Sequence, residues 1–128
     1  GFWRLISDGL TKTGRKIQTT RLESWSMPGI PDALFCSESG VFSFVELKIV
    51  RGTKVELSPH QVAFHSRHAH AACWIATRSR DLAIRVYPGS DAVDLRLDGP
   101  SAVEALAVFE EPYDWGEFFA LICPIETV

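Results

Sequence analysis

Three charged side chains lie in the strands, or at the start of a strand, of a segment whose apolar residues favour a buried β-hairpin. The segment is GIPDALFCSESGVFSFVELKIV, residues 29–50, and it sets Asp32, Glu46 and Lys48 among Val, Phe, Leu and Ile. Because side chains alternate along a strand, Glu46 and Lys48 share one face, and Asp32 at the start of the partner strand can come beside them. Two carboxylates and an ammonium group would then converge at one place on the sheet.

These residue types suit the metal-assisted hydrolysis of a phosphodiester. Two carboxylates, joined by a backbone carbonyl and waters, offer the hard oxygens that Mg²⁺ prefers. A neighbouring lysine can orient or help deprotonate a water and offset charge that builds on a phosphate. Spacing alone leaves two structural explanations open: Asp32 could cap the loop made by Gly29 and Pro31, and Glu46 and Lys48 could be solvated residues on an edge strand.

The elements that would position these residues form a mixed α/β pattern. Apolar spacing predicts a helix over residues 2–13, and β-branched residues predict a strand within 15–24. The hairpin strands are expected at about 32–37 and 41–50, and further strands at 72–79 and 82–88.

Helix-start signals complete the pattern. Ser58 with Gln61 three residues later predicts a capped helix, and we expect two C-terminal helices from the similar signals at Ser101 and Asp114. Residues 91–99, DAVDLRLDG, are interpreted as a solvated turn and strand. We therefore expect one domain over residues 1–128, with a core at about 2–87 and a C-terminal helical extension at about 100–124.

Charge is distributed unevenly along the chain. Residues 1–80 hold 11 Lys and Arg against 6 Asp and Glu, whereas residues 81–128 hold 2 against 10. A polyanion would meet the basic front half, although the acidic half could simply keep a small domain soluble. No apolar run approaches the roughly 18 residues of a membrane span, and no signal peptide is recognisable, so we expect a cytoplasmic protein that does not enter a membrane.

The motifs also resemble those of a known family. Gly29-Ile30-Pro31-Asp32 followed by Glu46-Leu47-Lys48 resembles the signature of PD-(D/E)XK nucleases. The G-x-P-D form, with Ser58-x-x-Gln61 downstream, is similar to the VRR-NUC branch, which includes small stand-alone phage and bacterial proteins. The resemblance covers about residues 2–80. It implies a single-domain restriction-endonuclease-like fold with a mixed central sheet flanked by helices, in the core order helix, three strands, helix, strand.

The resemblance implies a role for each matched residue of the hairpin. Asp32 and Glu46 would be metal ligands, helped by the backbone carbonyl of Leu47, and Lys48 would be the catalytic lysine. The implied cofactor is Mg²⁺, with Mn²⁺ as a substitute.

Two further residues are candidates for the same site. Glu23 matches the family's additional upstream acid, although it could instead pair with Arg21 or with a loop backbone group. Gln61 would act near the metal or a phosphate, but a capping box explains the Ser-x-x-Gln spacing equally well.

By the same resemblance the chain would be a metal-dependent DNA endonuclease. The implied substrates are branched or junction DNAs, as for Holliday-junction-resolving relatives, and the implied assembly is a homodimer in a bacterial or phage-infected cell. The alternative is a non-catalytic nucleic-acid-binding or assembly module that retains the fold. Basic residues near the motifs are candidates for DNA contacts: Arg15, Lys16, Arg51, Lys54 and Arg78.

Four histidines crowd the helix predicted after Ser58: His60, His65, His68 and His70. His70 does not follow helical spacing from His65, which disfavours a zinc site. We expect partly exposed histidines on this helix.

Overall fold

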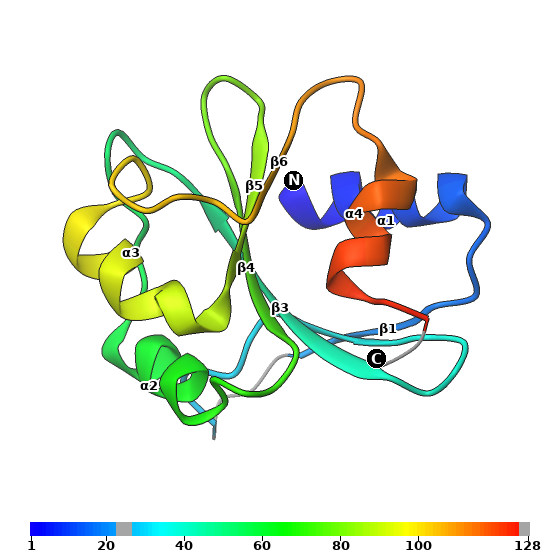
Figure 1. Ribbon diagram of the computed structural model, residues 1–128, viewed down its shortest axis with the longest axis horizontal. Coiled ribbons are helices and arrows are strands. Elements are labelled where there is room, and N and C mark those ends of the chain that lie inside the picture. Colours follow the sequence, from blue (N-terminus) through cyan, green and yellow to red (C-terminus); the bar gives the residue numbers. More distant parts are fainter. Residues whose placement is uncertain (23–26, 126–128) are drawn as a thin grey trace.

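A computed structural model describes residues 1–22 and 27–125 and shows a six-stranded sheet with helices on both faces (Figure 1). Along the sheet the strands follow their order in the chain, from β1 to β6. All neighbours are antiparallel except β3 and β4, which are parallel. The strands are β1 (Gln18–Arg21), β2 (Ala33–Cys36), β3 (Phe42–Ile49), β4 (Cys73–Arg78), β5 (Ile84–Pro88) and β6 (Ala107–Phe109). The expected α/β class with a mixed central sheet is confirmed.

The predicted hairpin is formed by β2 and β3. Ala33 lies opposite Val45 at one end of the ladder, and Cys36 lies opposite Phe42 at the other. In the turn, the Gly40 N–H donates to the Ser37 carbonyl at 2.9 Å, and Gly40 has a φ of 83°. A glycine is suited to this left-handed conformation because it has no Cβ.

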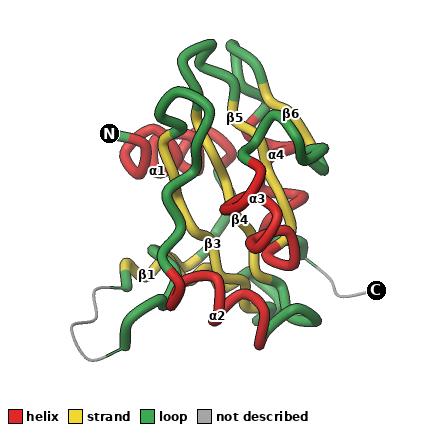
Figure 2. Tube along the Cα trace, turned by 90° about the vertical axis from the view of Figure 1, so that its left-hand side faces the viewer, coloured by secondary structure: helices red, strands yellow, loops and turns green. Residues whose placement is uncertain are grey.

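Helix α2 (Pro59–Arg67) makes the crossover that joins the parallel pair β3 and β4. The Gln61 N–H donates to Ser58 Oγ at 3.1 Å, and the Ser58 N–H donates to Gln61 Oε1 at 2.9 Å. The predicted capping box is thus present. Helix α3 (Ala92–Asp98) lies on the same face of the sheet as α2, and Figure 2 shows both in front of the strands.

The opposite face is covered by α1 (Phe2–Thr13) and α4 (Trp115–Ile122) (Figure 1). The core on this side includes Ile6 from α1 and Phe119 from α4, both at most 1 % exposed. The two helices come together at Gly9, where an added Cβ would lie 2.3 Å from the Trp115 indole. The absence of a side chain at this position therefore sets how closely α1 approaches α4.

Two expectations for the C-terminal part are wrong. Residues 92–98 form a helix and not a strand, because Ala92 and Leu95, three residues apart, both face the core. Residues 101–111 form a loop and the short strand β6 where a helix was expected. Alternate residues of 103–109 are half-buried, and β6 pairs with the edge of β5, so strand pairing prevails over the capping signal at Ser101. The extension over 100–124 is therefore helical only in α4.

No helix in the described ranges is long and apolar enough to cross a lipid bilayer.

Substituting Gly9 tests the contact between α1 and α4. Gly9→Ala should lower the free energy of unfolding by about 1–3 kcal/mol, since its methyl group would overlap the indole of Trp115. Gly116→Ala is a matched control in α4, because its Cβ would meet only Asp114 Oδ1 at 3.4 Å. Urea unfolding followed by tryptophan fluorescence measures both, and equal stability of Gly9→Ala and the parent protein would contradict the close contact.

Candidate active site

The candidate site lies where the start of β2 meets the second half of β3. Continuing the register of Ala33 with Val45 by one residue sets Asp32 opposite Glu46. Asp32 Oδ2 accepts a hydrogen bond of 2.7 Å from the backbone N–H of Leu47. The hairpin therefore brings the two carboxyl-bearing residues together, and a backbone group orients one of them.

Helix α2 adds Gln61 to this group. Lys48 Nζ donates to Gln61 Oε1 at 3.0 Å, and Gln61 Nε2 donates to Glu46 Oε2 at 3.5 Å. The same Oε1 also accepts the Ser58 N–H of the capping box. Gln61 thus caps the helix and also contacts both Lys48 and Glu46, and its role near a metal or a phosphate stays a prediction.

A glycine lets the loop before Asp32 rest on the start of α2. Gly29 has a φ of 89°, and an added Cβ would lie 2.2 Å from the His60 carbonyl oxygen and 2.9 Å from the Gln61 nitrogen. Any side chain would have to push the loop away from the helix. The close contact with α2 therefore explains why the G-x-P-D string begins with a glycine, Gly29.

Glu46 is buried without a full set of partners. It is 1 % exposed, and its Oε1 accepts no hydrogen bond from the described residues. Burial raises its pKa well above the ordinary carboxyl range, the Asp32 carboxyl raises it further, and the Lys48 ammonium opposes the shift. A second cation beside this carboxyl would stabilise its ionised form.

His65 is a member of the site that the sequence analysis missed, and the expectation that it is partly exposed is wrong. It is 0 % exposed, with Nε2 at 3.6 Å from Glu46 Oε1, too far for a hydrogen bond. Burial lowers its pKa to about 4, helped by His68 and Lys48, so the ring is neutral at neutral pH. The four-residue spacing from Gln61, which sets both on one face of α2, was the signal that could have identified it.

The donor set fits Mg²⁺. In residues 1–22 and 27–125, no three side chains of His, Cys, Asp or Glu are grouped so as to hold a metal ion. Mg²⁺, however, typically keeps several waters and is held through one or two carboxylates. Asp32 and Glu46 provide such a pair, and Oε1 of Glu46, which has no hydrogen-bond partner among the described residues, is free to coordinate a metal ion. Glu23 lies outside the described residues.

The basic candidates for DNA contacts differ in whether they form ion pairs and hydrogen bonds within the protein. Arg15 donates to both carboxylate oxygens of Glu38, at 3.1 and 2.8 Å, and to the Phe119 carbonyl at 3.1 Å. Arg78 Nη2 lies 3.9 Å from Glu111. These two guanidinium groups therefore serve contacts within the fold.

The other three basic candidates are Lys16, Arg51 and Lys54, and none makes an ion pair within the described part of the chain. Arg51 and Lys54 are joined through their backbones in a turn just after β3. Their side chains are available to an anion near the candidate site.

Among solved structures, the chain is similar to Hjc of Archaeoglobus fulgidus, a Holliday junction resolvase from an archaeal hyperthermophile. The TM-score is 0.45 and the sequence identity 20 %, over 66 % of this chain and 73 % of that chain. No family model matches the chain, and no curated protein matches it by sequence. The likeness to the VRR-NUC branch stays a prediction, and any assignment of function depends on the residues of the site.

The raised pKa of Glu46 predicts a pH-dependent stability of the metal-free protein. The folded chain retains a proton that the unfolded chain releases at about pH 4.3, so the free energy of unfolding in EDTA should fall as pH rises above that value. Glu46→Gln mimics the protonated group and should flatten this slope, whereas Glu56→Gln, an exposed control, should not. Urea unfolding at a series of pH values measures the slope, and an unchanged slope in Glu46→Gln would contradict the assignment.

Proposed function

We propose that the chain is a metal-dependent nuclease that hydrolyses DNA phosphodiester bonds. The observation that carries this proposal is the convergence of Asp32, Glu46, Lys48 and Gln61 from two strands and a helix. A buried carboxyl that lacks a full set of partners, beside a second carboxyl and a lysine, is costly for the fold and useful for a cation.

The two carboxylates and the Leu47 carbonyl would hold the metal, Mg²⁺ or Mn²⁺ in its place. When bound, such an ion polarises a phosphate oxygen and lowers the pKa of a water. The Leu47 N–H keeps one oxygen of Asp32 in hydrogen bonding and so fixes the orientation of this carboxylate. Gln61 Nε2 donates a hydrogen bond to Oε2 of Glu46 and so orients this carboxylate as well, which leaves Oε1 to coordinate the metal ion.

Lys48 would act on the phosphate and on the attacking water. Its ammonium group is half-buried and is held by Gln61 Oε1 at 3.0 Å, so its charge is fixed in position before substrate arrives. A fixed positive charge can offset the charge that develops on the phosphoryl oxygens, and its N–H groups can orient a water.

Glu23 is proposed as a further acid of the site. The support is that Leu22, which precedes it, donates its N–H to the Asp32 carbonyl at 2.9 Å. A third carboxylate would complete a metal site or position a water.

The proposed substrates are branched or junction DNAs, cut by a homodimer. Arg51 and Lys54 support a DNA partner, since they follow β3 directly and make no ion pair within the described ranges. Two-fold symmetric DNA substrates suit a two-fold symmetric pair of subunits.

Cleavage of labelled DNAs tests the proposal. We expect Mg²⁺- or Mn²⁺-dependent cutting within a panel of single strand, duplex, flap, splayed arm and four-way junction, and none in EDTA. Lys48→Ala should slow cutting by about 100-fold or more, and Asp32→Asn should also weaken Mn²⁺ binding measured by electron paramagnetic resonance. Lys12→Ala, on α1, is the control and should cut like the parent protein. If the panel is bound but never cut, and Mn²⁺ is not bound, the chain is a binding module and the proposal fails.

A pair of variants separates the two contacts of Gln61. Ser58→Ala removes the capping oxygen and should lower stability by about 0.5–2 kcal/mol while leaving the Gln61 side chain beside Lys48 and Glu46. Gln61→Ala should lower stability similarly and should also reduce kcat, because Lys48 and Glu46 lose their shared partner. Urea unfolding and steady-state cleavage of the two variants decide whether Gln61 acts in cleavage, and equal kcat values would leave Gln61 a capping residue alone.

A further inference from the structure

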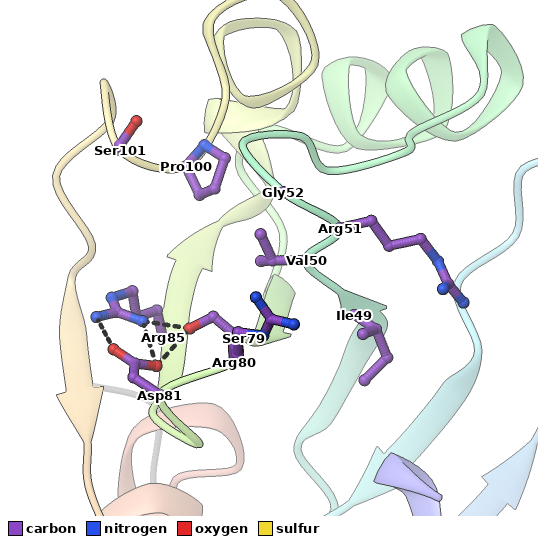
Figure 3. A pocket seen from close by; sticks show the side chains of 10 residues that line it. All are labelled: Ile49, Val50, Arg51, Gly52, Ser79, Arg80, Asp81, Arg85, Pro100 and Ser101. Carbon is purple, nitrogen blue, oxygen red and sulfur yellow. Dashed lines mark hydrogen bonds and ion pairs between the residues drawn. The ribbon is translucent and has the colours of Figure 1, made fainter.

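A hollow of about 730 Å³ lies beyond the end of β3. Ile49 and Val50 form one side of it, the β4–β5 turn with Arg80 forms a second, and Pro100 contributes a third (Figure 3). Its size is within the range of about 300–1,000 Å³ that is typical of ligand pockets. Val50, two residues after Lys48, also lines the hollow, so the hollow lies just past the candidate active site along the chain.

The hollow carries a surplus of positive charge. Arg51 and Arg80 make no ion pair with any described residue. Asp81 also lines the hollow, but it is engaged by Arg85 Nη2 at 2.9 Å and by Ser79 Oγ at 2.6 Å. These bonds, that from Arg85 above all, hold the pKa of Asp81 well below its usual range, so it stays ionised and paired with Arg85. Two guanidinium groups are left to attract an anion.

Apolar side chains face the same hollow. Ile49 is 47 % exposed although it belongs to a central strand, and Val50 and Pro100 line the hollow with it. Phosphate alone would gain nothing from these three side chains. A ligand with negative charges and a flat apolar face, such as a nucleotide unit, would contact both kinds of group.

The walls of the hollow are held in place by short contacts between loops. The N–H groups of Arg51 and Lys54 each donate to the other residue's carbonyl at 3.1 Å. An added Cβ on Gly99 would lie 2.3 Å from the Thr53 carbonyl oxygen, so the loop that leads to Pro100 touches this turn. The hollow is therefore preformed, and a ligand would not have to order it.

We propose that this hollow binds an unpaired strand of the DNA substrate, with one base against Ile49 and neighbouring phosphates on Arg80 and Arg51. The inference rests on the proposed nuclease function and narrows its substrate class. Figure 3 shows the Arg80 guanidinium directed toward Val50 and Ile49, while Arg51 extends away from the other lining side chains. This arrangement suits phosphates on either side of one nucleotide.

The apolar side chains of Ile49, Val50 and Pro100 favour unpaired over paired DNA. In a duplex the faces of the bases are stacked inside the helix, so they cannot contact Ile49, whereas an unpaired strand can turn a base outward. The hollow thus favours flaps and splayed arms over a fully paired duplex or four-way junction.

Binding measured in EDTA tests this site without cleavage. Fluorescence anisotropy would compare a splayed-arm DNA, the matched duplex and a free deoxynucleotide over a series of salt concentrations. The double variant Arg51→Ala/Arg80→Ala should weaken splayed-arm binding about tenfold and reduce the salt slope by about 1.4, or roughly 0.7 per phosphate. The control double variant Arg4→Ala/Arg96→Ala removes the same charge from α1 and α3 and should bind like the parent protein. Ile49→Thr keeps a β-branched residue and should reduce the preference for splayed-arm DNA over duplex.

The outcomes separate the two proposals. If the Arg51 and Arg80 variant binds like the control while the parent protein still cuts DNA, the hollow is not the strand site and the nuclease stands. Free deoxynucleotide bound as tightly as the splayed arm would also overturn the strand site. If the parent protein binds no DNA in EDTA but cuts the panel with Mg²⁺, the strand site fails and the nuclease stands; if it neither binds nor cuts, both proposals fail together.

Discussion

The free energy cost of burying the Glu46 carboxyl is the constraint on which this face of the sheet depends. An ionised carboxylate removed from water costs several kcal/mol unless charges and hydrogen bonds replace its hydration. Here it is approached by Asp32, just before β2, and by Gln61 and His65 from α2, and Gln61 Nε2 donates to its Oε2 at 3.5 Å. The fold holds these groups close to a position where a divalent cation would lower the cost. In the metal-free protein the raised pKa keeps a proton on Glu46, and this proton offsets the cost of burial.

The topology that makes the sheet mixed also closes the site. Parallel pairing of β3 with β4 requires a crossover, and α2 supplies it on the face to which Glu46 and Lys48 point. Gln61 and His65 lie one turn apart on that helix, so a single element delivers both side chains to Glu46. The hairpin delivers Asp32 from the other side. The β2–β3 hairpin and the capped start of α2 each have local hydrogen bonds, and the crossover brings the two together.

The parts that could be predicted from the sequence are those fixed by local chemistry. The hairpin follows from its turn glycine and apolar run, and the start of α2 follows from Ser58 and Gln61, whose capping bonds involve neighbouring residues only. The segments around 92–98 and 101–111 depend on tertiary contacts, since Leu95 reaches a core built by distant residues and β6 forms on the edge of β5. The burial of His65 likewise depends on how α2 is rotated against the sheet. Local signals were insufficient wherever a distant partner decided the structure.

The glycine at position 29 has a consequence for how this protein could be altered. Its backbone lies so close to the His60 carbonyl that a side chain would not fit between them. The loop before Asp32 and the first turn of α2 are therefore complementary in shape. A transplant of either segment into a related scaffold would disturb the spacing of Asp32 and Gln61 unless the other segment travelled with it. The two stretches are about thirty residues apart in the chain. They form a single exchangeable module, and their contact depends on glycine having no Cβ at position 29.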